Sequence, residues 1–147
     1  VLEIAAGDRL CSKYMEFTCI APLAGNESSK DLNENSLVLK MDWSSSNGLK
    51  DYSALFAGDI STETETMLCQ RGGFEEVDLF KANHHGSNYS NGALLLEKLS
   101  PKYIVVSCGE NNVYGHPGKD AVKRMEESGA EIFYTMDGGQ ITFPLIQ

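Results

Sequence analysis

The sequence is short of basic residues and has no long apolar run, and each shortage argues against a class of protein. Lys and Arg together number 12 against 21 Asp and Glu, which gives a net charge of −9. This excess of acid disfavours nucleic-acid binding through a broad basic surface. No apolar run approaches the ~18 residues that a membrane helix needs, and residues 1–10 lack the pattern of a signal peptide. We therefore expect no membrane contact from this segment.

Cysteine is also scarce, and the four present are not spaced as a metal site. No two of them form a C-x-x-C pair. Cys19, Cys69 and Cys108 lie in apolar segments, where a free cysteine behaves as a small core residue. We expect structural cysteines, with disulfides or metal ligation as the alternatives, and they do not indicate a cellular compartment.

Repeats, low-complexity tracts and linkers are absent, so the length predicts a single domain, residues 1–147. Hydrophobic residues at 41% and charged residues at 22% are typical of a globular chain. Asn47-Gly48 lies between the runs 36–43 and 52–58, and this arrangement predicts a β-hairpin.

The later part of the sequence alternates strand and helix patterns, which predicts the α/β class, with helices packed on a mixed sheet. The predicted strands are 14–21, 77–83, 102–109 and 130–136, and the predicted helices are 61–72, 90–100 and 116–129. A last hairpin is expected around 137–139, with 139–146 as its second strand. In such sheets the chemistry lies in loops at the carboxyl ends of strands.

Two of these strand ends carry candidate metal ligands. Asp59 follows an apolar run and Gly58, where a carboxylate can bind a cation or cap the following helix. His84 and His85 follow a strand, and adjacent residues of a continuing strand point to opposite faces. Only one of them would then face a site shared with Asp59, unless a turn at Gly86 swings both inward.

Further polar residues follow the histidine pair and the strand 102–109. Ser87 can cap the next segment or bond a ligand. Asn111, Asn112 and His116 form a polar loop of the kind that lines a substrate pocket. The alternatives are that the asparagines adopt turn conformations and that His116 caps a helix, while Asp137 simply makes the last turn.

These motifs together resemble the second half of a metallo-β-lactamase-fold domain. The resemblance rests on the order and spacing of "LFAGDI", "DLFKANHHGSNYS", "PKYIVVSCGENNVYGHPGKDAVKRM" and "TMDGGQITF" and covers nearly all 147 residues. It is closest to the hydrolase domain of the DNA-internalisation competence proteins and their stand-alone relatives. The resemblance implies an αββα sandwich and a metal-dependent hydrolase of the phosphodiesterase or nuclease type, with zinc or manganese, as two ions in the complete domain.

The resemblance also implies roles for individual residues. Asp59 resembles the carboxylate that bridges two metals, one of His84 and His85 resembles the last histidine ligand, and His116 resembles a ligand or pocket residue. Lys81 stands where relatives carry a lysine that could contact an anionic substrate. The metal and catalytic candidates are therefore Asp59, His84, His85 and His116, and the substrate-binding candidates are Lys81, Ser87, Asn111 and Asn112. A metal pair would supply hydroxide at neutral pH and neutralise phosphoryl charge.

The chain departs from this family in one respect that limits the assignment. The H-x-H-x-D-H motif, which supplies most metal ligands there, occurs nowhere in the chain, whose three histidines are at 84, 85 and 116. We favour a C-terminal portion of a longer domain, inactive alone and possessing no metal or only a partial site, over a degenerate relative. Its exposed sheet face would then be covered by the missing N-terminal half or by a second copy in a homodimer.

Two alternative functions remain open at this point. One is a hydrolase of the same fold acting on a small substrate, a phosphocholine ester or a lactone, which suits the acidic composition better than DNA. The other is a non-catalytic interaction module with a relic site. A competence-type protein would place this domain outside the cytoplasm, and otherwise we expect a cytoplasmic protein.

Overall fold

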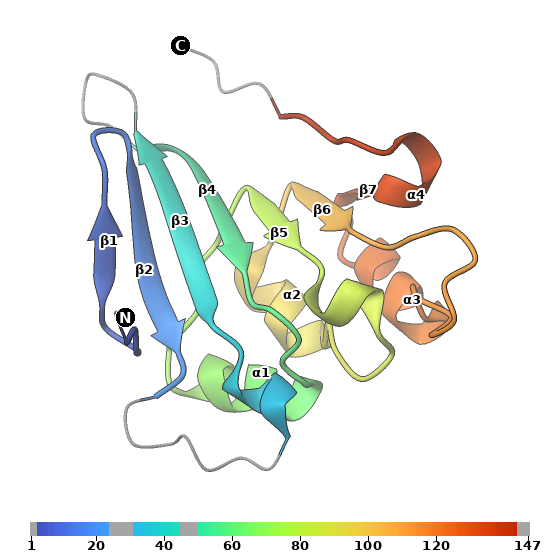
Figure 1. The fold of residues 1–147 in the computed structure, drawn as a ribbon, viewed down its shortest axis with the longest axis horizontal. Coiled ribbons are helices and arrows are strands. Elements are labelled where there is room, and N and C mark those ends of the chain that lie inside the picture. The colour runs from blue at the N-terminus through green and yellow to red at the C-terminus, as the bar shows by residue number, and fades with distance from the viewer. Residues whose placement is uncertain (1–2, 24–30, 45–49, 144–147) are drawn as a thin grey trace.

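The chain folds as one mixed β-sheet with helices packed on it (Figure 1). The computed structural model describes residues 3–23, 31–44 and 50–143, and within them the sheet has seven strands in chain order. Strands β1 to β4 pair antiparallel, and β4 to β7 pair parallel. The strands are β1 Arg9–Cys11, β2 Met15–Ala21, β3 Val38–Ser44, β4 Lys50–Phe56, β5 Leu79–Lys81, β6 Tyr103–Val106 and β7 Glu131–Tyr134. The predicted α/β class is confirmed.

Three helices connect the parallel strands and lie on one face of the sheet (Figure 1). Neighbouring parallel strands joined by right-handed crossovers place their helices on the same side. These are α1 Thr62–Gln70, α2 Ala93–Leu99 and α3 Lys119–Glu127, and a short α4 Thr135–Gly138 follows β7. Two 3-10 turns also occur, η1 Leu32–Asn35 between β2 and β3 and η2 Asn83–Gly86 between β5 and α2. Within the described ranges, no helix is long and apolar enough to cross a membrane.

The predicted central hairpin is confirmed, whereas the predicted last hairpin is wrong. Strands β3 and β4 pair antiparallel, although the Asn47-Gly48 turn lies outside the described residues. After β7 the chain enters α4, and residues 139–143 form no strand. The hydroxyl of Thr135 donates to the Cys108 carbonyl at 2.9 Å and accepts from the Cys108 N–H at 3.0 Å. This anchor ties the end of β7 to the end of β6 and turns the chain there.

The hydrophobic core fills the space between the sheet and the three helices. Leu55, Phe80 and Ile104 of the central strands are at most 1% exposed and pack with apolar side chains of α1 and α2. All four cysteines are free; Cys19 and Cys69 are buried, Cys108 is partly buried and Cys11 is exposed. The expected burial is therefore confirmed for Cys19 and Cys69.

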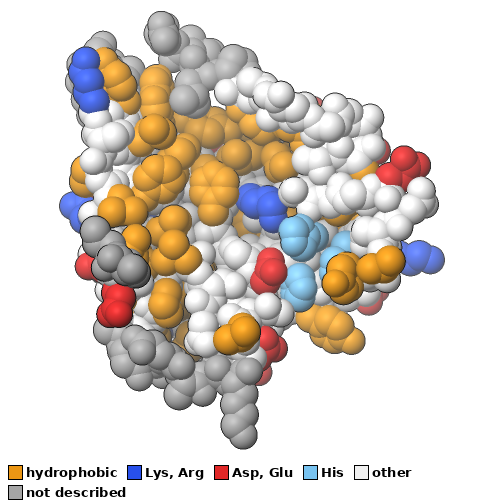
Figure 2. Space-filling model, in the orientation of Figure 1, with side chains coloured by type: hydrophobic (Ala, Val, Ile, Leu, Met, Phe, Trp, Pro, Cys, Tyr) orange, Lys and Arg blue, Asp and Glu red, His pale blue; other side chains and the backbone are white. Residues whose placement is uncertain are grey.

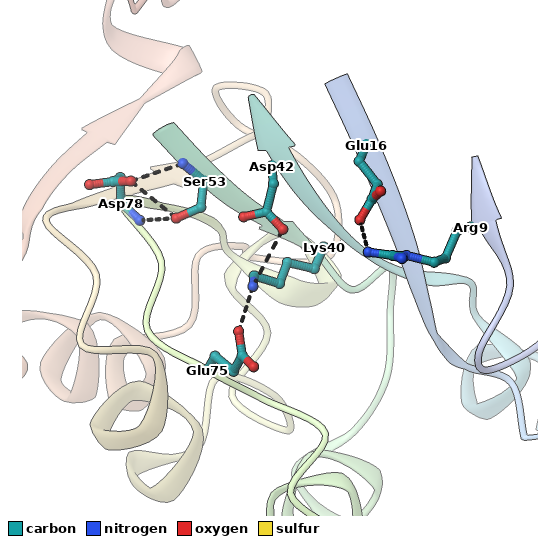
Figure 3. A network of polar contacts seen from close by, with 7 residues as sticks. All are labelled: Arg9, Glu16, Lys40, Asp42, Ser53, Glu75 and Asp78. Atoms are coloured by element: carbon teal, nitrogen blue, oxygen red, sulfur yellow. Dashed lines mark hydrogen bonds and ion pairs between the residues drawn. The ribbon is translucent and has the colours of Figure 1, made fainter. Parts of the chain in front are cut away.

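A polar network lies on the edge of this core, at the amino ends of the parallel strands (Figure 3). One oxygen of the Asp78 carboxylate accepts from the Ser53 N–H at 2.8 Å and from its hydroxyl at 3.0 Å, and the other accepts from Lys102 at 2.7 Å. Lys40 pairs with Glu75 at 2.6 Å. These contacts fix the start of β5 against β4, so the two strands end together at their carboxyl ends.

The other face of the sheet is largely apolar, and no helix of the described residues packs on it. In each strand, every second side chain points to this face, and the strand register aligns these side chains in rows across the sheet. Figure 2 shows hydrophobic side chains over most of this surface. Leu10 is 42% exposed, Met15 40% and Phe56 38%. We call this surface the open face, defined by Leu10, Met15, Phe17, Leu39, Met41, Trp43, Phe56, Leu79, Tyr103 and Phe133.

Candidate functional site

The candidate metal ligands lie in three loops at the carboxyl ends of β4, β5 and β6. Asp59 follows β4, after Gly58 with a φ of +58°. A Cβ on Gly58 would come within 2.6 Å of the Ser36 Cβ, so only glycine fits this turn. The backbone of Asp59 donates to the Ser36 hydroxyl, and helix α1 is capped instead by Ser61. The carboxylate of Asp59 is therefore not used as a helix cap.

The two adjacent histidines stand on a left-handed turn, not on a strand. Strand β5 ends at Lys81, and His84 and His85 have φ values of +46° and +55°. Gly86 continues the turn at φ +81°. Left-handed backbone costs an L-residue about 1–2 kcal/mol, and such strain is typical of functional sites. The turn is held in place by the His84 N–H, which donates to the Gly58 carbonyl at 3.0 Å.

A hydrogen bond fixes the orientation of one imidazole. Nδ1 of His85 lies 2.7 Å from the Ser107 carbonyl oxygen. A carbonyl can only accept, so Nδ1 carries the proton and the exposed Nε2 of the neutral ring keeps its lone pair. Histidine ligands of metals are commonly held by this kind of contact from the other ring nitrogen.

The third histidine comes from the loop after β6 and lies against the first. The ring centroids of His84 and His116 are 5.5 Å apart, and those of His84 and His85 are 6.5 Å apart. The exposed Tyr114 ring stacks on His116 at 6.0 Å and 16°. His116 does not cap α3, whose first turn begins after Gly118. All three imidazoles thus share one site, beside acidic and basic side chains (Figure 2).

Charges in the site act on one another. Burial lowers the pKa of His116, the neighbouring imidazoles lower it further, and Asp59 opposes them. Burial also lowers the pKa of Lys81, again opposed by Asp59. A neutral imidazole is the form that binds a metal ion. Lys81 points its ammonium at the Ala82 carbonyl, at 2.7 Å, next to these groups.

The donor types suit zinc or manganese, but the count of converging donors is low. Imidazole nitrogen and carboxylate oxygen are ligands of both metals. In the part of the chain that the structure describes, no three side chains of His, Cys, Asp or Glu converge closely enough to hold an ion. These side chains lie at the edge of the open face, and binding of a metal by them stays a prediction.

The remaining predicted site residues, Asn111, Asn112 and Ser87, take part in turns and hydrogen bonds within their own loops. The Asn112 amide accepts from the His116 N–H at 3.0 Å and donates to the Gly109 carbonyl at 3.0 Å. Asn111 takes a left-handed conformation at φ +55°, as the turn interpretation expects. Ser87 is buried, and its hydroxyl accepts from the Tyr89 N–H. These contacts shape the loops around the histidines, and their role toward a substrate stays a prediction.

Sequence reasoning missed a buried polar cluster beneath the histidine turn. Glu65 of α1 is 1% exposed, and Asn83 and Asn91 are fully buried beside it. Glu65 precedes Leu68 and Cys69 by three and four residues, so it shares the inward face of the helix with them. The signal that could have revealed the cluster is the carboxylate of Glu65 at a helical position whose neighbours on the same face are apolar.

Among known proteins, the chain is similar to two competence proteins. ComE operon protein 3 of Bacillus subtilis (strain 168) is 30% identical over 141 residues, which are 96% of this chain and 17% of that protein. Competence protein ComA of Neisseria gonorrhoeae is 34% identical over 92 residues, 62% of this chain and 13% of that protein. The chain is a relative of competence proteins.

This similarity confirms the competence-protein part of the predicted resemblance, while the metallo-β-lactamase fold stays a prediction. Uncharacterized protein YcaI of Escherichia coli (strain K12) is also similar, at 26% identity over 129 residues, 87% of this chain and 16% of that protein. The matched segments thus span 17%, 13% and 16% of the lengths of these three relatives, less than a fifth of each. No family model matches the chain.

Proposed function

We propose that this chain forms one half of a metal-dependent phosphodiesterase centre in a competence-related protein. The observation that carries the proposal is the meeting of three imidazoles and Asp59 at the carboxyl ends of neighbouring strands. Similarity to two competence proteins supports the competence-related role.

In this proposal Asp59, His84, His85 and His116 hold zinc or manganese, as two ions in the complete centre. The metal would supply hydroxide at neutral pH and would neutralise the charge that develops on phosphoryl oxygens. The contribution of this chain is orientation. The Ser107 carbonyl holds His85 with Nε2 free, Asn112 holds the backbone of His116, and Lys81 places a cation beside the site for an anionic substrate.

The remaining ligands come, in our proposal, from a second β-layer that covers the open face. Sheets with parallel strands are normally covered on both faces, and here one face carries exposed Leu10, Met15 and Phe56. The site lies at the edge of that face, because Lys81 shares a cross-sheet row with Phe56 and Val105. The relatives have more than four-fifths of their length outside the matched segment, which is enough chain to provide such a layer.

Phe56→Glu tests whether the open face is covered. In the 147-residue chain alone, this change should cost about 1–2 kcal/mol of unfolding free energy, because the ring is 38% exposed and only part of its apolar contact is lost. In a longer protein that buries the face, it should cost about 3 kcal/mol or more. Sedimentation of the chain alone distinguishes the occupants, since a stable dimer would identify a second copy as the cover. An equally small effect in both proteins would contradict the proposal.

The activity test compares phosphodiester and other substrates in a protein that joins this chain to its covering layer. We expect hydrolysis of a single-stranded oligonucleotide or bis-p-nitrophenyl phosphate with manganese or zinc, and a loss of at least about 100-fold in Asp59→Asn and His85→Ala. Asp78→Asn, at the opposite ends of the strands, serves as the control and should keep its activity. Hydrolysis of a phosphocholine ester or lactone alone would replace the substrate class.

A second candidate function is a non-catalytic interaction module. The specific observation in its favour is that, among the described residues, no three metal-binding side chains lie close enough together to hold one ion. A protein with its open face covered that gains no thermal stability from zinc or manganese would support this candidate and exclude the first.

A further inference from the structure

The histidine turn has an unfavourable backbone conformation that needs contacts from the surrounding structure to hold it. His84, His85 and Gly86 are all left-handed, with φ values of +46°, +55° and +81°. Two consecutive non-glycine residues in this region persist only where surrounding contacts impose the conformation. The ligands of the proposed site therefore depend on whatever clamps the two ends of the loop 83–92.

The clamp on the inner side is the carboxylate of Glu65. Its Oε1 accepts from the Asn83 side-chain amide at 2.7 Å and from the Asn91 N–H at 2.7 Å, and its Oε2 accepts from the Gly92 N–H at 2.7 Å. One side chain thus binds the first residue of the loop and the two at its end. All three partners are donors, so the position requires an acceptor at both oxygens.

The two asparagines close the same loop on themselves. The Asn83 N–H donates to the Asn91 side-chain oxygen at 2.7 Å, and the Asn91 side-chain amide donates to the Asn83 carbonyl at 3.0 Å. These residues and Glu65 are at most 1% exposed, where hydrogen bonds are difficult to replace with water. Movement of Glu65 would therefore remove the hydrogen bond that holds the side chain of Asn83, the residue directly before His84.

The clamp on the outer side is Arg124 of α3. Its guanidinium donates to the carbonyls of Asn88, Ser90 and Asn91 at 2.9, 2.8 and 2.9 Å. The loop is thus hydrogen-bonded to both α1 and α3, and its two left-handed histidines lie on its solvent side. Burial raises the pKa of Glu65, while its donors and Arg124 oppose that rise.

We infer that Glu65 is a positioning residue, whose carboxylate sets the left-handed conformation of the His84–His85 turn through Asn83 and thereby the geometry of the proposed metal site. Its metal readout rests on the proposed function, whereas its effect on the loop does not. Glu65→Gln tests it, because glutamine keeps the size of the side chain but turns a donor toward one of the three donor groups.

The experiment measures two quantities on the full chain: amide hydrogen exchange and the affinity for zinc alone. The control is Asp78→Asn, which removes a carboxylate that also accepts three hydrogen bonds but lies at the other end of the sheet. Glu65→Gln should speed exchange at 83–92 by about 10-fold relative to the control and weaken zinc binding by about 10-fold. Both variants are compared at conditions that leave the same fraction folded.

The outcomes separate this inference from the proposed function. Faster exchange confined to 83–92 in Glu65→Gln supports the inference, even if wild type binds no zinc, a result that would count against the proposed site alone. Equal exchange in Glu65→Gln and Asp78→Asn overturns the inference. Zinc affinity unchanged in Glu65→Gln, with wild type binding zinc, overturns it as well. If Glu65→Gln does not fold, Asn83→Ala, which removes one of the three donors, replaces it in the same comparison.

Discussion

Gly86→Ala should be more damaging than Gly72→Ala, because a left-handed backbone and a close contact meet at Gly86, whereas only the left-handed backbone is present at Gly72. Gly86 has a φ of +81°. A Cβ there would lie 2.8 Å from the Pro117 Cβ and 3.2 Å from the Val106 Cγ1. Pro117 belongs to the loop that carries His116, so the close approach of Gly86 is what joins the two histidine loops. Their backbones are also linked by the Gly118 N–H, which donates to the Gly86 carbonyl at 2.8 Å.

The size of the effect follows from these contacts. Alanine in left-handed backbone costs about 1–2 kcal/mol. Forcing a methyl group into a packed contact costs about 1–3 kcal/mol more, so the expected loss is about 2–5 kcal/mol of unfolding free energy. Gly72 is a matched control, because its φ is +72° but nothing lies within 4 Å of its Cβ position. Gly72→Ala should cost only the backbone part, about 1–2 kcal/mol.

Urea unfolding of wild type and both variants measures the difference directly. The midpoint should fall further for Gly86→Ala than for Gly72→Ala, with similar m-values for both. Equal losses of unfolding free energy in the two variants would mean that Gly86 does not pack against Pro117. The histidine loops would then be less tightly coupled than the structure indicates.

Two further predictions concern Asp78 and His85. Asp78→Asn should lower the free energy of unfolding by about 1–3 kcal/mol at pH 7 in urea unfolding. Burial would raise the pKa of Asp78, but hydrogen bonds from Lys102 and Ser53 outweigh it, so the pKa is lowered in the folded state. The stabilisation is therefore complete above the unfolded pKa of about 3.9 and is lost as pH falls through the folded pKa. The gap between wild type and the variant should therefore narrow below pH 4, and a constant gap would contradict it. Neutral His85 should show the Nδ1–H tautomer in ¹⁵N-correlated NMR, since Nδ1 faces the Ser107 carbonyl, and an Nε2–H form would exclude that contact.

Much of the fold follows from local sequence patterns. Apolar runs marked the strands, and the Ser61 cap and the glycines marked the helix boundaries, because these signals act through neighbouring residues. Strand β5 is shorter than the predicted 77–83, since the chain leaves the sheet before the histidines. The last hairpin was predicted wrongly because Thr135 binds Cys108, 27 residues away, and no local pattern reveals such a contact.

The candidate site divides in the same way. Asp59 and the histidines were predictable, because residues after parallel strands meet at one edge of the sheet. The conformation of His84 and His85 was not predictable from local sequence, because the loop 83–92 is bonded to Glu65 of α1 and Arg124 of α3, which are distant in the sequence. The open face was expected from the resemblance to half of a sandwich, and the structure shows its apolar residues, while its cover remains a proposal.

In the proposed function, Asp59 and the three histidines form one metal site, and a zinc titration followed by NMR is its sharpest test. The chain holds only part of the ligand set, so weak binding is expected, but its location is specific. Signals of the His84, His85 and His116 imidazoles and the Asp59 carboxyl carbon should shift together at one affinity, and Asp59→Asn should abolish the shared response. Shifts at exposed Cys11 and its partner Glu16, with the histidines unchanged, would contradict the proposed site.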